Sequence, residues 1–201
     1  MAHFRPVQSF AEAYAGSAFA HPRWIGFKDW SITIEGQIPV NDLSKTAFVK
    51  RPDLYVETEG EFAGWRTWTR DSFESNNGPF WHRVEEDGRV RCAFRVEKKH
   101  LNGMRNVHGG CFMTFADYSL FALASSVLQG PGVTVSFGCE FLDAAREGEL
   151  VECEGEITRA GGSLIFLRGL LKSGERSLFT FSGTIKRVKW KPRTDAAAVA
   201  T

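Results

Sequence analysis

The sequence predicts an α+β fold in which an antiparallel sheet wraps around one long central helix. Three observations predict it: one apolar stretch of helical length at residues 110–128, six shorter runs rich in strand-forming residues, and turn-type sequences between them. The expected order is two strands, the helix and then four strands, with an N-terminal extension before them. This order is typical of a sheet that buries a single helix.

The strands are bounded by clear turn signals. Residues 80–84 and 89–96 flank the sequence EEDG, whose Asp-Gly pair favours a hairpin between antiparallel strands. After the helix, the sequences REGE, RAGG and KSGER separate four further β-type runs. We expect these strands at residues 133–142, 150–158, 164–171 and 177–188.

The helix has almost no polar face, because Asp117 is the sole Asp, Glu, Lys, Arg or His side chain between residues 111 and 128. Such a helix must be covered on all sides. A small curved sheet leaves part of the helix and one sheet edge uncovered, so we expect a homodimer or homotetramer. The stretch is about long enough to span a bilayer, but Asp117 and the flanking Gly-Gly and Gly-Pro-Gly sequences argue against a membrane segment.

Composition limits the partners and the compartment. The 201 residues suit one domain with an extension: residues 1–71 as the extension, 72–190 as the domain and 191–201 as a flexible tail. Lys+Arg (25) nearly balances Asp+Glu (24), which argues against nucleic acid or an anionic membrane surface as a partner. The four cysteines have no Cys-x-x-Cys spacing, which indicates reduced thiols in the cytoplasm and no metal site.

The N-terminal extension holds four of the six tryptophans. Residues 10–19 have the composition of a short helix, and residues 30–36 (WSITIEG) that of a strand. Because disordered segments are poor in aromatic residues, we expect part of the extension to pack on the domain or on a partner subunit.

Two features of the central segment point to chemistry. Burying a carboxylate is costly, so Asp117 is either satisfied by specific donors or kept for chemistry with a raised pKa. His108, Gly109 and Gly110 stand where the helix begins, and free N–H groups there suit an oxyanion, although two glycines also make a plain tight turn. Asn102 in the preceding loop is either a neutral donor or a turn residue.

The spacing of these features has a geometric consequence. Asp117 follows Gly110 by seven residues, which places it on nearly the same helical face but about 10 Å further along the axis. One reacting carbonyl cannot contact both groups of a single helix. If both serve one reaction, two antiparallel helices at a subunit interface must each supply one of them.

The stretches VEKKHLNGMRNVHGGCFMTFAD and GPGVTVSFGCEFLDAAREGE resemble the PaaI-like branch of hot-dog-fold thioesterases, over about residues 72–189. The resemblance implies a hot-dog fold and hydrolysis of acyl-CoA thioesters to free acid and CoA. It implies that Gly109 N–H and Asn102 bind the thioester carbonyl, while Asp117 of the opposite subunit acts as general base or nucleophile. Thr134 would position the water, and His108 would orient the loop or the thioester, unless it is a structural turn residue.

Substrate contacts follow less directly from the resemblance. Gly110 is expected to contact substrate, Arg105 either to narrow the loop or to contact an anionic ligand, and Arg146 to contact the phosphates of coenzyme A. Arg187, with Lys186 and Lys189, either contacts these phosphates or forms a solvated basic face. Arg105 stands where the family usually has glycine, and Asp143-Ala144 replaces a pair that includes proline. Large side chains either line the acyl tunnel, favouring short, medium or aromatic acyl groups, or belong to the core: Phe112, Phe115, Tyr118 and Phe121.

Two other functions remain open. A hot-dog dehydratase or hydratase requires a His with an acidic partner, and the sequence contains no motif of that type. A non-catalytic acyl-CoA-binding protein is compatible with the Arg105 departure and the extension. We expect no cofactor, and coenzyme A is expected only as part of the substrate.

Overall fold

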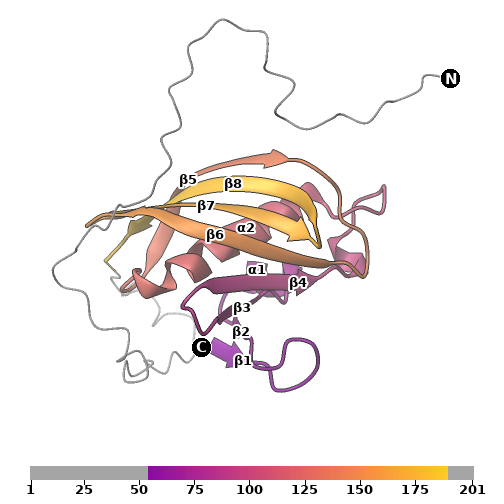
Figure 1. Ribbon diagram of the computed structural model, residues 1–201, viewed down its shortest axis with the longest axis horizontal. Helices are drawn as coiled ribbons and strands as arrows, with labels where there is room; N and C mark the ends of the chain where they lie inside the picture. Colours follow the sequence, from indigo (N-terminus) through magenta and orange to yellow (C-terminus); the bar gives the residue numbers. More distant parts are fainter. Residues whose placement is uncertain (1–53, 190–201) are drawn as a thin grey trace, which may run out of the picture. The chain divides into compact units, whose positions relative to one another are not determined.

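The computed structural model describes residues 54–189 (Figure 1). The expected helix at residues 10–19, the strand at 30–36 and the tail at 191–201 lie outside the described residues. The strands are β1 (Leu54–Val56), β2 (Arg66–Trp68), β3 (Trp81–Val84), β4 (Val90–Arg95), β5 (Gly132–Phe141), β6 (Leu150–Ala160), β7 (Leu164–Ser173) and β8 (Arg176–Arg187). The helices are α1 (Ser72–Asn77), α2 (Gly109–Leu123) and the 3-10 turns η2 (Lys98–His100) and η3 (Ala124–Ser126).

The eight strands form one antiparallel sheet with the order β1-β2-β3-β4-β6-β7-β8-β5. Figure 1 shows the sheet curving around α2. The predicted α+β architecture is therefore confirmed, and the six strands expected from the sequence are all present. β5 lies at one edge of the sheet and β1 at the other.

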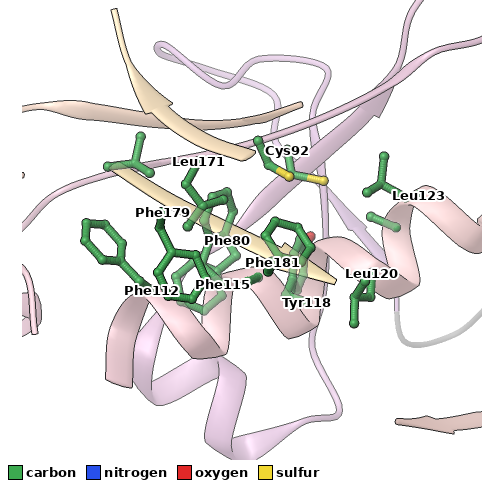
Figure 2. Packing of buried hydrophobic residues seen from close by; sticks show 14 of the residues in the cluster. Phe80, Cys92, Phe112, Phe115, Tyr118, Leu120, Leu123, Leu171, Phe179 and Phe181 are labelled. Carbon is green, nitrogen blue, oxygen red and sulfur yellow. The ribbon is translucent and has the colours of Figure 1, made fainter. Parts of the chain in front are cut away.

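The core lies between α2 and the concave face of the sheet. Phe80, Phe115 and Tyr118 are almost fully buried and contact one another through their rings, and Phe112 packs near Phe179 (Figure 2). At Gly183 of β8, a Cβ atom would lie 2.3 Å from Leu120 Cδ1, so glycine is required for the helix to approach the sheet this closely. Removing a large side chain from such a core costs about 2–5 kcal/mol.

α2 ends earlier than the sequence predicts. The apolar stretch runs to residue 128, but the α-helical turns stop at Leu123 and tighten into η3. A 3-10 turn at a helix end uses i to i+3 hydrogen bonds, and here Val127 N–H donates to Ala124 O at 3.0 Å. Gly130, at φ +124°, then turns the chain towards β5.

β1 and β2 are additions that the sequence patterns did not reveal. They form a hairpin that extends the sheet beyond β3, and Phe62 in its loop stacks on Trp81 at 5.5 Å between ring centroids. Trp65 is buried beside them, and Trp68 packs on Tyr118 at 4.6 Å. These tryptophans therefore pack on the domain, and residues 54–68 belong to the same sheet as the expected domain at 72–190.

Candidate active site

The N-terminus of α2 presents an unpaired amide. His108 is the N-cap: its Nδ1 accepts from Gly110 N–H at 2.9 Å and its carbonyl accepts from Cys111 N–H at 2.8 Å. The N–H of Gly109, the residue between His108 and Gly110, has no hydrogen-bond partner among residues 54–189. This donor stands at the positive end of the helix dipole, where an oxyanion is stabilised. Gly110, expected to contact substrate, has its own N–H already occupied.

The hydrogen bond to Gly110 also fixes the form of the His108 ring. Because Nδ1 accepts a hydrogen bond from the Gly110 N–H, the ring proton of the neutral imidazole must be on Nε2. The side chain is exposed, so this Nε2–H is available to a ligand at the helix N-terminus. The structural and the substrate-orienting role of His108 are therefore compatible.

Asn102 shapes the loop before α2. Its Oδ1 accepts from the N–H groups of Met104 (2.9 Å) and Asn106 (3.2 Å), which leaves its Nδ2 donors unused within the described part of the chain. Arg105 in this loop has φ +63°, the left-handed region that favours glycine. This explains why glycine is expected at that position, and why arginine there is strained.

Asp117 is half-buried in the middle of α2 and accepts a hydrogen bond of 2.6 Å from Thr134 Oγ1 on β5. Loss of water around the carboxylate raises the Asp117 pKa, the bond from Thr134 lowers it, and the charge of Asp71 raises it. A bulge in the pairing of β5 with β8, between Thr134 and Ser136, bends the strand beside this contact. Asp117 therefore has both a specific hydrogen-bond donor, Thr134, and a raised pKa.

A second carboxyl group, Glu74, lies near Asp117 and was not predicted from the sequence as part of the site. Glu74 lies on α1, and burial together with the charges of Asp71 and Asp117 raises its pKa to about 7. The available signal was Asp71, whose side chain accepts from Phe73 N–H and Glu74 N–H as the N-cap of α1. Its proximity to Asp117 arises from the packing of α1 on α2, which no local pattern encodes.

Within one subunit the two halves of the expected site remain apart. α2 is continuous from Gly109 to Leu123, so Asp117 and the free amide are separated along it by about 12 Å. Asp117 is paired with Thr134, whereas Gly109, Asn102 and His108 gather at the helix N-terminus. One subunit alone therefore cannot place both groups on one thioester.

The expected phosphate contacts separate into two locations. Arg105 and Arg146 line an open hollow of about 450 Å³ next to the loop before α2, together with Leu101, Met104, Asn106 and Glu147. Asp143 accepts hydrogen bonds from Ala144 N–H and the Arg176 guanidinium, which holds the turn leading to Arg146 without the proline usual in the family. The sequence predicted both arginines but not that they share a hollow.

Arg187 and Phe112 lie elsewhere. The Arg187 guanidinium donates to the carbonyl oxygens of Gly161 and Val127, beyond the C-terminal end of α2. Phe112 is 2% exposed and belongs to the core beside Phe179. Within residues 54–189, no three His, Cys, Asp or Glu side chains form a group suited to a metal ion. In the same part of the chain, no helix has both the length and the apolar character to span a bilayer.

An antiparallel sheet wrapped around one long helix is the hot-dog fold, and comparison with known proteins identifies the family. A family model described as the thioesterase superfamily matches residues 104–180. A putative esterase of Pseudomonas aeruginosa is 34% identical over 108 residues, which cover 53% of this chain and 81% of that protein. The chain belongs to the thioesterase superfamily.

Two further relatives agree with the resemblance to the PaaI-like branch. Human acyl-coenzyme A thioesterase 13 is 31% identical over 80 residues, 39% of this chain and 57% of that protein's length. A solved structure of the phenylacetic acid degradation protein PaaI from Thermus thermophilus is 27% identical with a TM-score of 0.51. That match covers 59% of this chain and all of the other, so the predicted family is confirmed.

Proposed function

We propose that the protein hydrolyses acyl-CoA thioesters, with Asp117 from one subunit and the N-terminus of α2 from another acting on the same carbonyl. The observation that carries the proposal is the unpaired Gly109 N–H at the start of the helix that also holds Asp117. The name of the human relative, an acyl-coenzyme A thioesterase, supports the substrate class.

The proposed mechanism follows from the free donors. Gly109 N–H and Asn102 Nδ2–H donate to the thioester oxygen, and His108 Nε2–H orients the thioester. Asp117 removes a proton from water as the water oxygen attacks the carbonyl carbon, while Thr134 holds the carboxylate in place. The tetrahedral intermediate then breaks its C–S bond, and the departing CoA thiolate takes up a proton. Direct attack by Asp117, followed by hydrolysis of the anhydride, is the alternative order.

The proposal requires a homodimer or homotetramer. Asp117 lies on a stripe of α2 with Met113 and Phe121, and Met113 is 43% exposed. The neighbouring edge strand β5 exposes Val133 and Val135. Apolar side chains along an edge strand that no other strand of the described residues pairs support a second subunit beside β5, with its α2 antiparallel to the first.

The hollow beside the helix N-terminus is the proposed site for the phosphates of coenzyme A. Arg105 and Arg146 supply charge there, while Glu147 lies 3.9 Å from the Arg105 guanidinium and holds it over the hollow. Coenzyme A enters as part of the substrate, and Arg187 would reach it only from a neighbouring subunit. The free thiols of Cys92, Cys111, Cys139 and Cys153 support a cytoplasmic location.

The test is thiol release from a panel of short, medium and aryl acyl-CoAs. Asp117→Asn should lower kcat by about a thousandfold, because the amide cannot accept a proton, and the fold should be retained. Glu86→Gln, an exposed acid in the β3–β4 turn, is the matched control. Turnover by Asp117→Asn at the parental rate would refute the assignment. Binding of CoA esters without any thiol release by the parent protein would identify a non-catalytic binder.

A further inference from the structure

We infer that a pocket bounded by β2, α1 and α2 receives the acyl group, and that Glu74 makes this pocket selective for uncharged acyl groups over those ending in a carboxylate. The inference rests on the proposed function, because it assigns the acyl end of the same substrate. The pocket includes Tyr118, a candidate for the acyl tunnel from the sequence, and Glu74, which the sequence did not predict.

The pocket has a volume of about 170 Å³ and mixed walls. The rings of Trp68, Phe80 and Tyr118 form its apolar side, and Glu74, Thr67 and Lys99 are among its polar residues. A cavity of about 150 Å³ holds one benzene ring. The pocket therefore suits a single ring or a chain of a few carbon atoms, and long chains would extend beyond it.

The pocket lies next to the proposed reacting group. Tyr118 directly follows Asp117 on α2, and α1 packs against α2, so Glu74 is close enough to Asp117 for their charges to interact. Trp68 contacts the Tyr118 ring at 4.6 Å and closes the side towards β2. An acyl group whose carbonyl is beside Asp117 therefore has this pocket within reach.

Glu74 is the one acid and Lys99 the one cation among the residues that line the pocket. The Glu74 carboxylate has no hydrogen bond or ion pair with any residue between 54 and 189, whereas Lys99, which also lines the pocket, lies 3.4 Å from Glu97. Asp71 and Asp117 add further negative charge near Glu74. A carboxylate at the end of an acyl chain would meet this charge at short range in a partly desolvated site, where repulsion reduces binding by roughly ten- to a hundredfold.

Two of the three walls come from outside the segment that the family model matches. β2 and α1 both precede residue 104, where the match begins. The hairpin of β1 and β2 packs through Phe62 and Trp65 on Trp81 of β3, and Trp68 on β2 contacts the Tyr118 ring. The selectivity would therefore belong to this chain's additional strands and helix.

The experiment compares pentanoyl-CoA with glutaryl-CoA, which have the same chain length and differ in a terminal methyl or carboxylate. At pH 8, where Glu74 with a pKa of about 7 is ionised, the parent protein should favour pentanoyl-CoA in kcat/KM by tenfold or more. Glu74→Gln should raise kcat/KM for glutaryl-CoA relative to that for pentanoyl-CoA about tenfold. Glu86→Gln removes the same charge at an exposed turn and should leave kcat/KM for both substrates unchanged.

A binding measurement separates this inference from the proposed function. S-pentyl-CoA and S-(4-carboxybutyl)-CoA are unreactive thioethers of matched length, and calorimetry gives their affinities whether or not the protein turns over thioesters. A preference for the pentyl ligand that narrows in Glu74→Gln supports the pocket, even if hydrolysis fails. Two ratios decide the outcome: kcat/KM for pentanoyl-CoA over glutaryl-CoA, and affinity for S-pentyl-CoA over S-(4-carboxybutyl)-CoA. If neither ratio differs between Glu74→Gln and the parent protein, the pocket assignment is overturned while hydrolysis stands.

Discussion

Asp117 and Thr134 illustrate how one residue's environment sets its chemistry. Burial moves the Asp117 pKa upward, and the hydrogen bond from Thr134 partly opposes this change. A general base or nucleophile must be ionised, so activity should fall as the pH drops through the Asp117 pKa. The position of that acidic limb therefore depends on the Thr134 hydroxyl.

Thr134→Val tests this dependence. The valine has a similar shape but no donor, so the carboxylate loses a charge-assisted hydrogen bond and its pKa rises further. The acidic limb of the kcat/KM profile should therefore move to higher pH. Thr134→Ser keeps the donor and should keep the limb near its original position. A purely structural role for Thr134 would lower activity at all pH values without moving the limb.

Arg105 carries a conflict between backbone and side chain. Its φ of +63° strains any residue other than glycine, while its guanidinium, 85% exposed, lines the hollow proposed for phosphates. Arg105→Gly should stabilise the fold by up to about 1 kcal/mol in urea denaturation and raise KM for acyl-CoA. Arg105→Lys keeps both strain and charge, so its stability should match the parent. If Arg105→Gly leaves KM unchanged, the phosphate contact is excluded.

The sequence was informative where one residue type has a special backbone or charge requirement. His108 caps α2, Gly109 begins it and Asp117 lies within it, which is where the local pattern places them. Arg146 was expected only from the family resemblance, and it lines the hollow with Arg105. Glu74 could not be predicted as part of the site, because its pKa depends on Asp71 and Asp117 brought near by tertiary packing. The pairing of Arg187 with two backbone carbonyls is likewise a long-range contact with no local signal.

Among the elements, length decided what the sequence could predict. β5 to β8 each span ten to twelve residues and carry a clear pattern between turn signals. β1 and β2 have three residues each and α1 has six, too few for a periodic pattern to emerge. These short elements are held by tertiary contacts: the β1–β2 hairpin by the aromatic cluster of Phe62, Trp65 and Trp81, and α1 by its packing on α2.

Trp65→Ala tests the role of the β1–β2 hairpin. Trp65 is 6% exposed, meets Phe62 edge to face at 5.6 Å and lies under the Arg83 guanidinium at 4.7 Å. Its removal should lower the free energy of unfolding by about 3–5 kcal/mol, measured by urea denaturation. Phe73→Ala, at a position 64% exposed on α1, should cost less than about 0.5 kcal/mol. Equal effects of the two substitutions would show that the hairpin is only loosely attached.

At the scale of the whole molecule, the proposed catalysis depends on the assembly of two subunits. The helix dipole that activates Gly109 and the buried acid at Asp117 lie on the same straight α2, so neither can approach the other within a subunit. A second subunit can resolve this separation if its helix runs antiparallel to the first. Each dimer then contains two identical sites, and each site needs Asp117 from one subunit and the α2 N-terminus from the other.

Mixing two inactive variants tests this arrangement. Asp117→Asn removes the acid, and Asn102→Asp removes a carbonyl donor and adds a repulsive charge, while the aspartate Oδ1 still accepts the loop's two backbone N–H groups. Each variant alone should be inactive. After refolding of an equimolar mixture, half of the dimers are mixed and one of their two sites is intact, so thiol release should recover to about one quarter of the parental rate. Mixing the two folded variants without refolding is the control, because thiol release should then recover only as fast as the dimers exchange subunits. If both groups acted within one subunit, every site in the mixture would lack one of them, and no activity would return.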